Sequence, residues 1–123
     1  MITHSPIIED TFKNGGGTYR ADLRGPAELP DHGYMVGSCK IAALSLPVGS
    51  PNEITRTLDR ASEACGLPND YVGTWIDGDT LHIDVAQYVE TEGQAAALCI
   101  ARDEMTYWDI QKGVAINPRD TSV

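Results

Sequence analysis

The stretch that decides the fold spans residues 71–89 and reads YVGTWIDGDTLHIDVAQYV. Apolar and polar residues alternate on both sides of Asp77-Gly78, and a period of two is typical of a half-buried β-strand. The dipeptide Asp-Gly favours the positive φ angles of a two-residue hairpin loop. We therefore predict a β-hairpin within about 71–89, with strands over 71–76 and 79–89.

The predicted hairpin has two chemically different faces. With a two-residue loop at 77–78, Ile76 pairs with Asp79 and Trp75 pairs with Thr80. The apolar face is expected to join the core and carries Val72, Thr74, Ile76, Leu81, Ile83 and Val85. The other face is polar and aromatic and carries Tyr71, Gly73, Trp75, Thr80, His82 and Asp84.

Capping residues predict two helices that pack on this sheet. Residues 50–53 read Ser-Pro-Asn-Glu, a capping box with proline at the first helical position, and they predict a helix over about 51–65. Residues 91–94 read Thr-Glu-Gly-Gln and predict a second helix over about 92–103, with Met105 as a core contact after it. The first helix has one apolar stripe, formed by Ile54, Leu58, Ala61 and Cys65.

The remaining segments complete a single α+β domain, residues 1–123, with a mainly antiparallel sheet. Shorter strands are expected over 18–23, 34–39, 105–110 and 114–116, and the apolar stretch 41–48 reads as a strand or a buried connector. Because three consecutive glycines at 15–17 disfavour regular structure, a mobile N-terminal segment is expected over about 1–17. Residues 117–123 are expected to form a frayed C-terminal tail.

The charge of the chain excludes several kinds of partner. Nine Lys and Arg stand against 18 Asp and Glu, a net charge of −9, and the basic residues are scattered. We therefore expect no direct nucleic-acid binding and no membrane binding, since both rely on clustered basic residues. The three cysteines, Cys39, Cys65 and Cys99, are widely spaced, as expected of free thiols in a cytoplasmic protein.

His82 and Asp84 are the weak candidates for catalysis. They project from the same face of a strand, and a carboxylate beside an imidazole can set its tautomer and prepare a general base. A solvated sheet face explains the same pair without any chemistry. A metal site needs a third ligand, and His4 and His32 lie in stretches that we expect to be mobile, so we predict no metal and no cofactor.

Several segments of the C-terminal half resemble a known group of sequences. The quoted residues are Tyr71-Val72-Gly73-Thr74-Trp75-Ile76-Asp77, then Leu81-His82-Ile83-Asp84-Val85, an alanine-rich stretch over 95–102, and Thr106-Tyr107-Trp108-Asp109-Ile110. This pattern resembles small uncharacterised accessory proteins of actinobacterial phages and prophages. The resemblance implies a small accessory protein that acts in the cytoplasm of a bacterial host.

The function predicted from these observations is binding of a protein partner, from host or phage, without enzymatic activity. The expected binding residues are Tyr71, Trp75 and His82, because aromatic side chains on a sheet face are good contact anchors. An exposed sheet edge is the alternative contact surface. A homo-oligomer is compatible with this hypothesis. Two alternatives stay open: a small hydrolase or isomerase that uses His82 and Asp84, and an inhibitor that sequesters a ligand or imitates nucleic acid.

Overall fold

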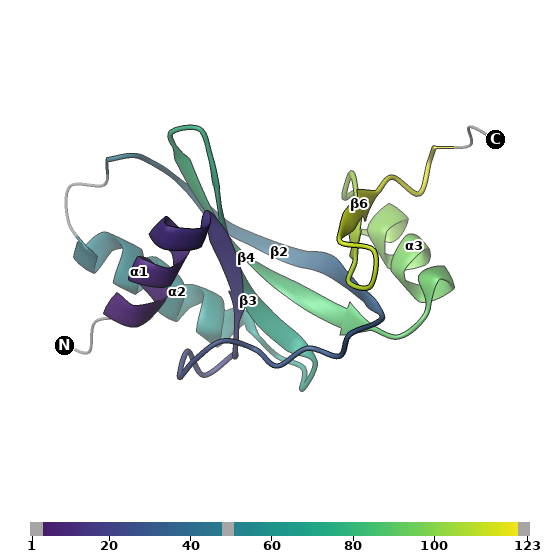
Figure 1. Cartoon of the computed structure of the whole chain (residues 1–123), viewed down its shortest axis with the longest axis horizontal. Coiled ribbons are helices and arrows are strands. Elements are labelled where there is room, and N and C mark those ends of the chain that lie inside the picture. The colour runs from purple at the N-terminus through teal and green to yellow at the C-terminus, as the bar shows by residue number, and fades with distance from the viewer. Residues whose placement is uncertain (1–3, 48–50, 121–123) are drawn as a thin grey trace.

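A computed structural model, which describes residues 4–47 and 51–120, arranges six strands in one sheet with three helices packed against it (Figure 1). The predicted α+β class with a mainly antiparallel sheet is therefore confirmed. In chain order the elements are α1 (Ser5–Asn14), β1 (Gly16–Tyr19), β2 (Tyr34–Ser45), α2 (Pro51–Ala64), β3 (Asp70–Asp77), β4 (Thr80–Val89), α3 (Glu92–Ala101), β5 (Tyr107–Asp109) and β6 (Val114–Ile116).

The strands lie in the order β1-β3-β4-β2-β5-β6, and all neighbouring pairs are antiparallel. The predicted strand over 34–39 continues to Ser45, so the segment read as strand or connector is mostly strand, with Val48 outside the described residues. Two irregularities in the pairing with β4, at Gly37/Cys39 and Lys40/Ala42, interrupt this long strand. The predicted strands around 105–110 and 114–116 are present as β5 and β6.

The hairpin of β3 and β4 is present, but its register differs from the predicted one. Trp75 pairs with His82 and Ile76 pairs with Leu81, so the two-residue loop is Gly78-Asp79. Of these two loop residues only Gly78 has a positive φ, of 60°, as in a turn with glycine at the first central position. Each residue thus faces a residue two positions away from its predicted partner. Because side chains alternate with a period of two, a shift of two leaves every residue on its predicted face.

The N-terminal segment is not the mobile loop that we predicted, at least from residue 5 onward. Pro6 lies in the first turn of α1, where its missing amide hydrogen is tolerated, and Gly15 ends the helix in the left-handed conformation with φ 81°. Gly16 and Gly17 then pair with Trp75 and Thr74 of β3. The glycines thus form a helix cap and an edge strand. Residues 1–3 lie outside the described residues.

The predicted strand over 18–23 stops at Tyr19. The chain turns there, with the Arg20 amide donating to Gly25 O at 3.0 Å and Leu23 at φ 61°. Leu23 is still buried, because the turn brings it back onto the core.

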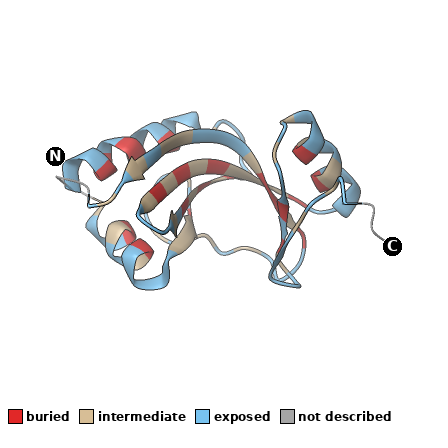
Figure 2. Cartoon of the chain, turned by 90° about the horizontal axis from the view of Figure 1, so that it is seen from above, coloured by how far each residue is buried: buried red, intermediate tan, exposed pale blue. Residues whose placement is uncertain are grey.

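Helices α1 and α2 cover the apolar side of the β3–β4 hairpin at one end of the molecule (Figures 1 and 2). The predicted helix over 51–65 is present as α2, and its stripe is buried at Ile54, Leu58 and Ala61, with Cys65 packed at its edge. The predicted cap residue Ser50 lies outside the described residues. A buried hydrogen-bond group joins α1 to the sheet: Thr11 Oγ1 lies 2.8 Å from Thr74 Oγ1 and 3.2 Å from the Tyr19 hydroxyl.

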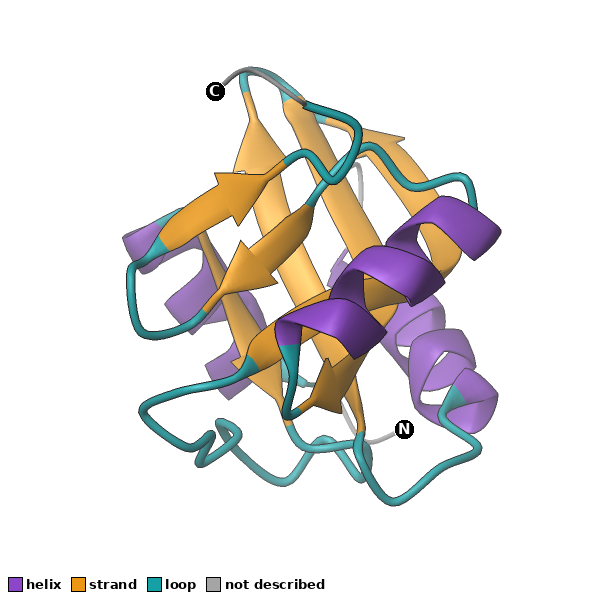
Figure 3. Ribbon diagram, turned by 90° about the vertical axis from the view of Figure 1, so that its right-hand side faces the viewer, coloured by secondary structure: helices purple, strands orange, loops and turns teal. Residues whose placement is uncertain are grey.

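A second, smaller core lies at the opposite end of the sheet, where α3 packs beside the β5–β6 hairpin (Figure 3). It contains Val36, Val89, Ala95, Cys99 and Tyr107. The predicted capping box is confirmed: the Gln94 amide donates to Thr91 Oγ1 at 3.2 Å, and the Thr91 amide donates to Gln94 Oε1 at 3.3 Å.

The prediction that Met105 enters the core is wrong, since 77% of its surface is exposed. The cause is the end of α3, where Asp103 has φ 55° and turns the chain away before β5. Beyond β6, residues 117–120 form no helix or strand, but the Arg119 Nη1 group donates to Glu104 O at 2.8 Å. Residues 121–123 lie outside the described part. Among the described residues, no helix combines the length and apolar character needed to cross a bilayer.

Candidate functional site

The hairpin turns its polar and aromatic side away from the α1/α2 core. Leu81 and Ile83 point into that core, so the intervening His82 and the following Asp84 project from the opposite side of β4. The same alternation places Trp75 on that side of β3. We call this side the open face; its central residues are Gly73, Trp75, His82 and Asp84.

Two adjoining hollows, of about 550 and 640 Å³, lie on the open face. Both are lined by Gly37, Trp75, Asp84 and Thr106, and we refer to the two together as the groove. His82 and Lys40 line the smaller hollow, whereas Trp108 lines the larger one. The groove therefore combines residues from five strands, β1 to β5, and from the segment that follows α3.

Trp75 and His82 form a stacked pair at one side of the groove. Their ring centroids are 4.2 Å apart and their planes differ by 12°. The stack follows from the register, because the two residues are direct cross-strand partners. Trp75 keeps 46% of its surface exposed, so the pair offers a flat aromatic surface to the groove.

Asp84 lies on the floor of the groove, directly opposite Gly73 in the β3–β4 pairing. A methyl group at Gly73 would overlap the Asp84 Oδ1 atom, so the missing side chain makes room for this carboxylate. Burial is the largest cause that raises the pKa of Asp84 to about 6; the negative charge of Glu104 adds to the rise and Lys40 opposes it. Asp84 therefore exchanges its proton about two pH units above an ordinary aspartate.

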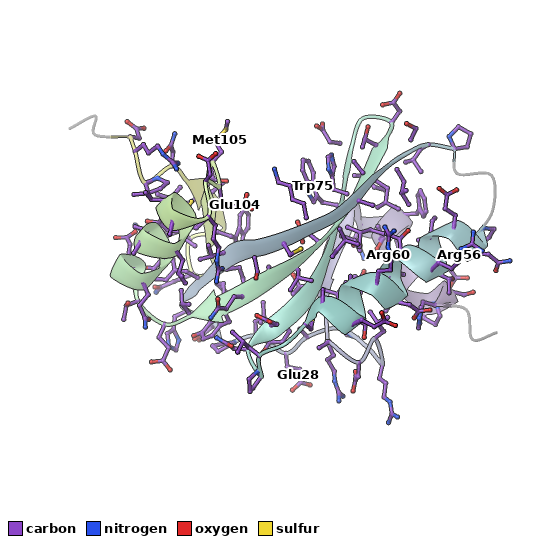
Figure 4. The ribbon with its side chains drawn as sticks, turned by 180° about the vertical axis from the view of Figure 1, so that it is seen from behind. Glu28, Arg56, Arg60, Trp75, Glu104 and Met105 are labelled. Atoms are coloured by element: carbon purple, nitrogen blue, oxygen red, sulfur yellow. The ribbon has the colours of Figure 1, made fainter. Side chains whose placement is uncertain are left out.

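The second carboxylate comes from Glu104, in the turn after α3. The Glu104 amide donates to Cys99 O at 2.9 Å, and its side chain lies over Gly37, with Oε1 2.9 Å from the point that a Cβ would occupy there. Figure 4 shows Glu104 and Trp75 on the same side of the sheet, with Glu104 next to α3. Within residues 4–47 and 51–120, the carboxylates of Glu104 and Asp84 have no hydrogen bond and no ion pair.

Arg102 holds the Glu104 turn against the sheet. Its Nη2 group donates to Gln87 Oε1 at 2.6 Å and its Nη1 group donates to Gly37 O at 3.3 Å. The two hydrogen bonds of the Arg102 guanidinium therefore go to the scaffold beside the groove.

Trp108 lines the other end of the groove. It belongs to β5 and pairs with Met35 of β2, while its neighbours Tyr107 and Asp109 are buried. Because side chains alternate along a strand, Trp108 points the other way and remains 45% exposed. Two half-exposed tryptophans, Trp75 and Trp108, therefore line the 640 Å³ hollow.

The structure brings together two of the three predicted binding residues. Trp75 and His82 both line the groove, whereas Tyr71, on the same side of β3, does not. The weak catalytic candidates His82 and Asp84 also line it, but in the described residues no hydrogen bond joins them, and the electrostatic neighbours of Asp84 are Glu104 and Lys40.

Sequence reasoning missed Glu104 and Trp108. The alternation of Tyr107, Trp108 and Asp109 was a usable signal for an exposed Trp108, since a strand was predicted there. No local signal marks Glu104, because its position depends on the turn at Asp103 and on the packing of α3.

The groove can offer aromatic faces, two carboxylates and a floor of small residues to a ligand. Among the described residues, no group of three or more His, Cys, Asp or Glu side chains is arranged to hold a metal ion.

Comparisons of the chain with protein-family models, with curated proteins and with solved structures found no match.

Proposed function

We propose that the chain is a non-enzymatic binding protein that takes a segment of a partner protein into the groove. The observation that carries this proposal is the pair of half-exposed tryptophans, Trp75 and Trp108, on a hollow of about 640 Å³. Tryptophan is enriched among the residues that dominate protein–protein binding energy, and its wide ring gains most when a partner covers it. Two such residues on one hollow suit a chain segment with two anchoring contacts.

The floor of the groove supports an extended segment. Ala86 carries only a methyl group, so the backbone of a bound segment can come close to the sheet there, whereas the space over Gly37 and Gly73 is taken by the carboxylates of Glu104 and Asp84. The hollow is open to solvent and so differs from the enclosed cavity that a small metabolite would need.

The resemblance to phage and prophage accessory proteins suggests a host or phage protein in a bacterial cytoplasm as the partner. The hydrolase or isomerase alternative has less support, because in the described residues no hydrogen bond joins Asp84 to the His82 ring. A general base prepared by this pair would need the carboxylate to orient the imidazole.

Selection from a displayed random peptide library tests the proposal. Wild type should enrich a family of sequences, and synthetic peptides from that family should bind Trp75→Ala and Trp108→Ala at least about tenfold more weakly, since truncation of an anchor that dominates an interface costs about 2 kcal/mol or more. The matched control is Leu67→Ala, which removes a side chain that is 52% exposed outside the groove. Binding to this control should equal that of wild type. No enriched family, or equal binding by all three variants, would refute the proposal.

A further inference from the structure

We infer that the segment bound in the groove presents an arginine, whose guanidinium lies between the carboxylates of Asp84 and Glu104 and against a tryptophan ring. This inference rests on the proposed function and adds the chemistry of the partner to it. The juxtaposition that carries it is two carboxylates and two half-exposed tryptophans around one groove.

The two carboxylates lie close enough to interact. Both line the smaller hollow, and the charge of Glu104 adds to the effect of burial, which is the largest cause that raises the pKa of Asp84. In the described part of the chain neither carboxylate accepts a hydrogen bond. An incoming cation therefore relieves a repulsion that already exists in the free protein.

The cationic groups of the chain nearest to Glu104 are used elsewhere. Arg102 donates to Gln87 and to the backbone of Gly37, and Arg119 donates to the backbone oxygen of Glu104 at 2.8 Å, not to its carboxylate. Lys40 lines the same hollow and lowers the pKa of Asp84, but its ammonium group lies beyond ion-pair distance. The position between the carboxylates is thus left for a cation from outside.

The tryptophans favour arginine over lysine. A guanidinium is planar, donates several hydrogen bonds in fixed directions and stacks on aromatic faces, so one group can contact two carboxylates and an indole together. A lysine ammonium is a compact, strongly hydrated charge that gains less from such a surface.

A second charged hollow, of about 460 Å³, lies on α2, and no tryptophan is among the described residues that line it. It is lined by Arg56 and Arg60 together with Glu53, Asp59 and Glu63, so acidic and basic side chains already lie side by side (Figure 4 labels the two arginines). The groove on the open face differs from this hollow in combining two carboxylates with two half-exposed tryptophans. The net charge of −9 also draws basic segments toward the chain.

The peptide selection described above also tests this inference, with separate outcomes. The enriched family should contain an arginine at a fixed position, and replacing it with citrulline, its neutral analogue, should weaken binding about tenfold or more. Asp84→Asn and Glu104→Gln should each weaken the arginine peptide several-fold and leave the citrulline peptide unchanged. Glu28→Gln, an exposed carboxylate outside the groove, is the matched control and should change neither.

The pH dependence of binding gives a further readout. The groups that act on Asp84 are Glu104 beside it and Lys40 on β2, and β3 contributes the uncharged Gly73. Affinity for the arginine peptide should fall as pH drops through about 6 in wild type and should stay nearly constant in Asp84→Asn. An enriched family that depends on Trp75 and Trp108 but has no fixed arginine, or a fixed lysine in its place, would overturn this inference and leave the proposed function standing. Failure of all selection would overturn the proposed function itself.

Discussion

Replacing Asp84 with asparagine should make the protein more stable at neutral pH, although the change removes a native charge. Among the described residues no group donates a hydrogen bond to this carboxylate, and burial, with the charge of Glu104 adding to it, raises its pKa from 3.8 to about 6. A difference of that size corresponds to about 3 kcal/mol of unfavourable free energy when the group is ionised, at 1.36 kcal/mol for each pH unit. Asparagine has the same shape and no charge, so it should recover most of this amount.

The sign of the effect follows from proton binding. The folded chain holds the Asp84 proton more tightly than the unfolded chain does, so wild-type stability falls as pH rises from about 4 to about 6. Above about 6 both states are ionised and the full cost remains. Below about 4 both states are protonated and the cost disappears. The difference in free energy of unfolding between variant and wild type should therefore grow from near zero at pH 4 to about 3 kcal/mol at pH 7.5.

Urea denaturation at a series of pH values measures this difference. The matched control is Asp77→Asn, the same substitution at an exposed carboxylate of the same hairpin, and its effect should be small and independent of pH. Glu104→Gln should shift the fall in wild-type stability toward lower pH, because it removes the neighbouring negative charge. Asp84→Asn could instead change stability no more than Asp77→Asn does, or by a constant amount at every pH. Either result would show that the ionised Asp84 carboxylate does not lower the stability of the fold.

Four further substitutions test how the scaffold around the groove is built, each by denaturant unfolding. Gly73→Ala should change stability by less than about 1 kcal/mol, because the added methyl group meets only the end of the Asp84 side chain, which can turn aside; a loss of about 3 kcal/mol would show that the carboxylate is held rigidly on the floor. Gly78→Ala should cost about 1 kcal/mol because of the φ of 60° alone, since no atom lies within 4 Å of the position that the added Cβ would occupy. Gly93 has equally open surroundings but lies in helix α3, so Gly93→Ala should stabilise the fold by about 0.5 kcal/mol. Equal effects of these two alanines would contradict the conformational argument. Thr91→Ala should cost about 1 kcal/mol by removing the cap of α3, and a loss below about 0.3 kcal/mol would mean that helix packing makes the cap redundant.

The α+β class, the hairpin and two of the three helices could be predicted because neighbouring residues encode them. The alternation around Asp77-Gly78 assigns each side chain of β3 and β4 to a face, and that assignment survives the change of register. The capping box at Thr91 is formed as predicted, because its two hydrogen bonds join residues three positions apart.

Helix α1 could not be predicted with the same signals. Its N-cap residue, His4, makes no side-chain capping bond, and the three glycines after the end of the helix suggested a loop. The helix depends on contacts that are distant in sequence, in particular Ile7 in the first core and Thr11 with Thr74. Tertiary packing of an amphipathic face contributes most of the stability of a short helix, so its local sequence gives a weak signal.

Local patterns in the sequence thus account for the polar and aromatic face of the hairpin, including Trp75, His82 and Asp84. The groove itself depends on long-range contacts: β5 must pair with β2 to bring Trp108 to one end, and the turn after α3 must place Glu104 over Gly37. Strand alternation is a property of each backbone segment, whereas the distance between two side chains depends on how separate segments pack. For that reason the sequence predicts which residues face outward, and the folded chain alone places two carboxylates close enough for one to raise the pKa of the other.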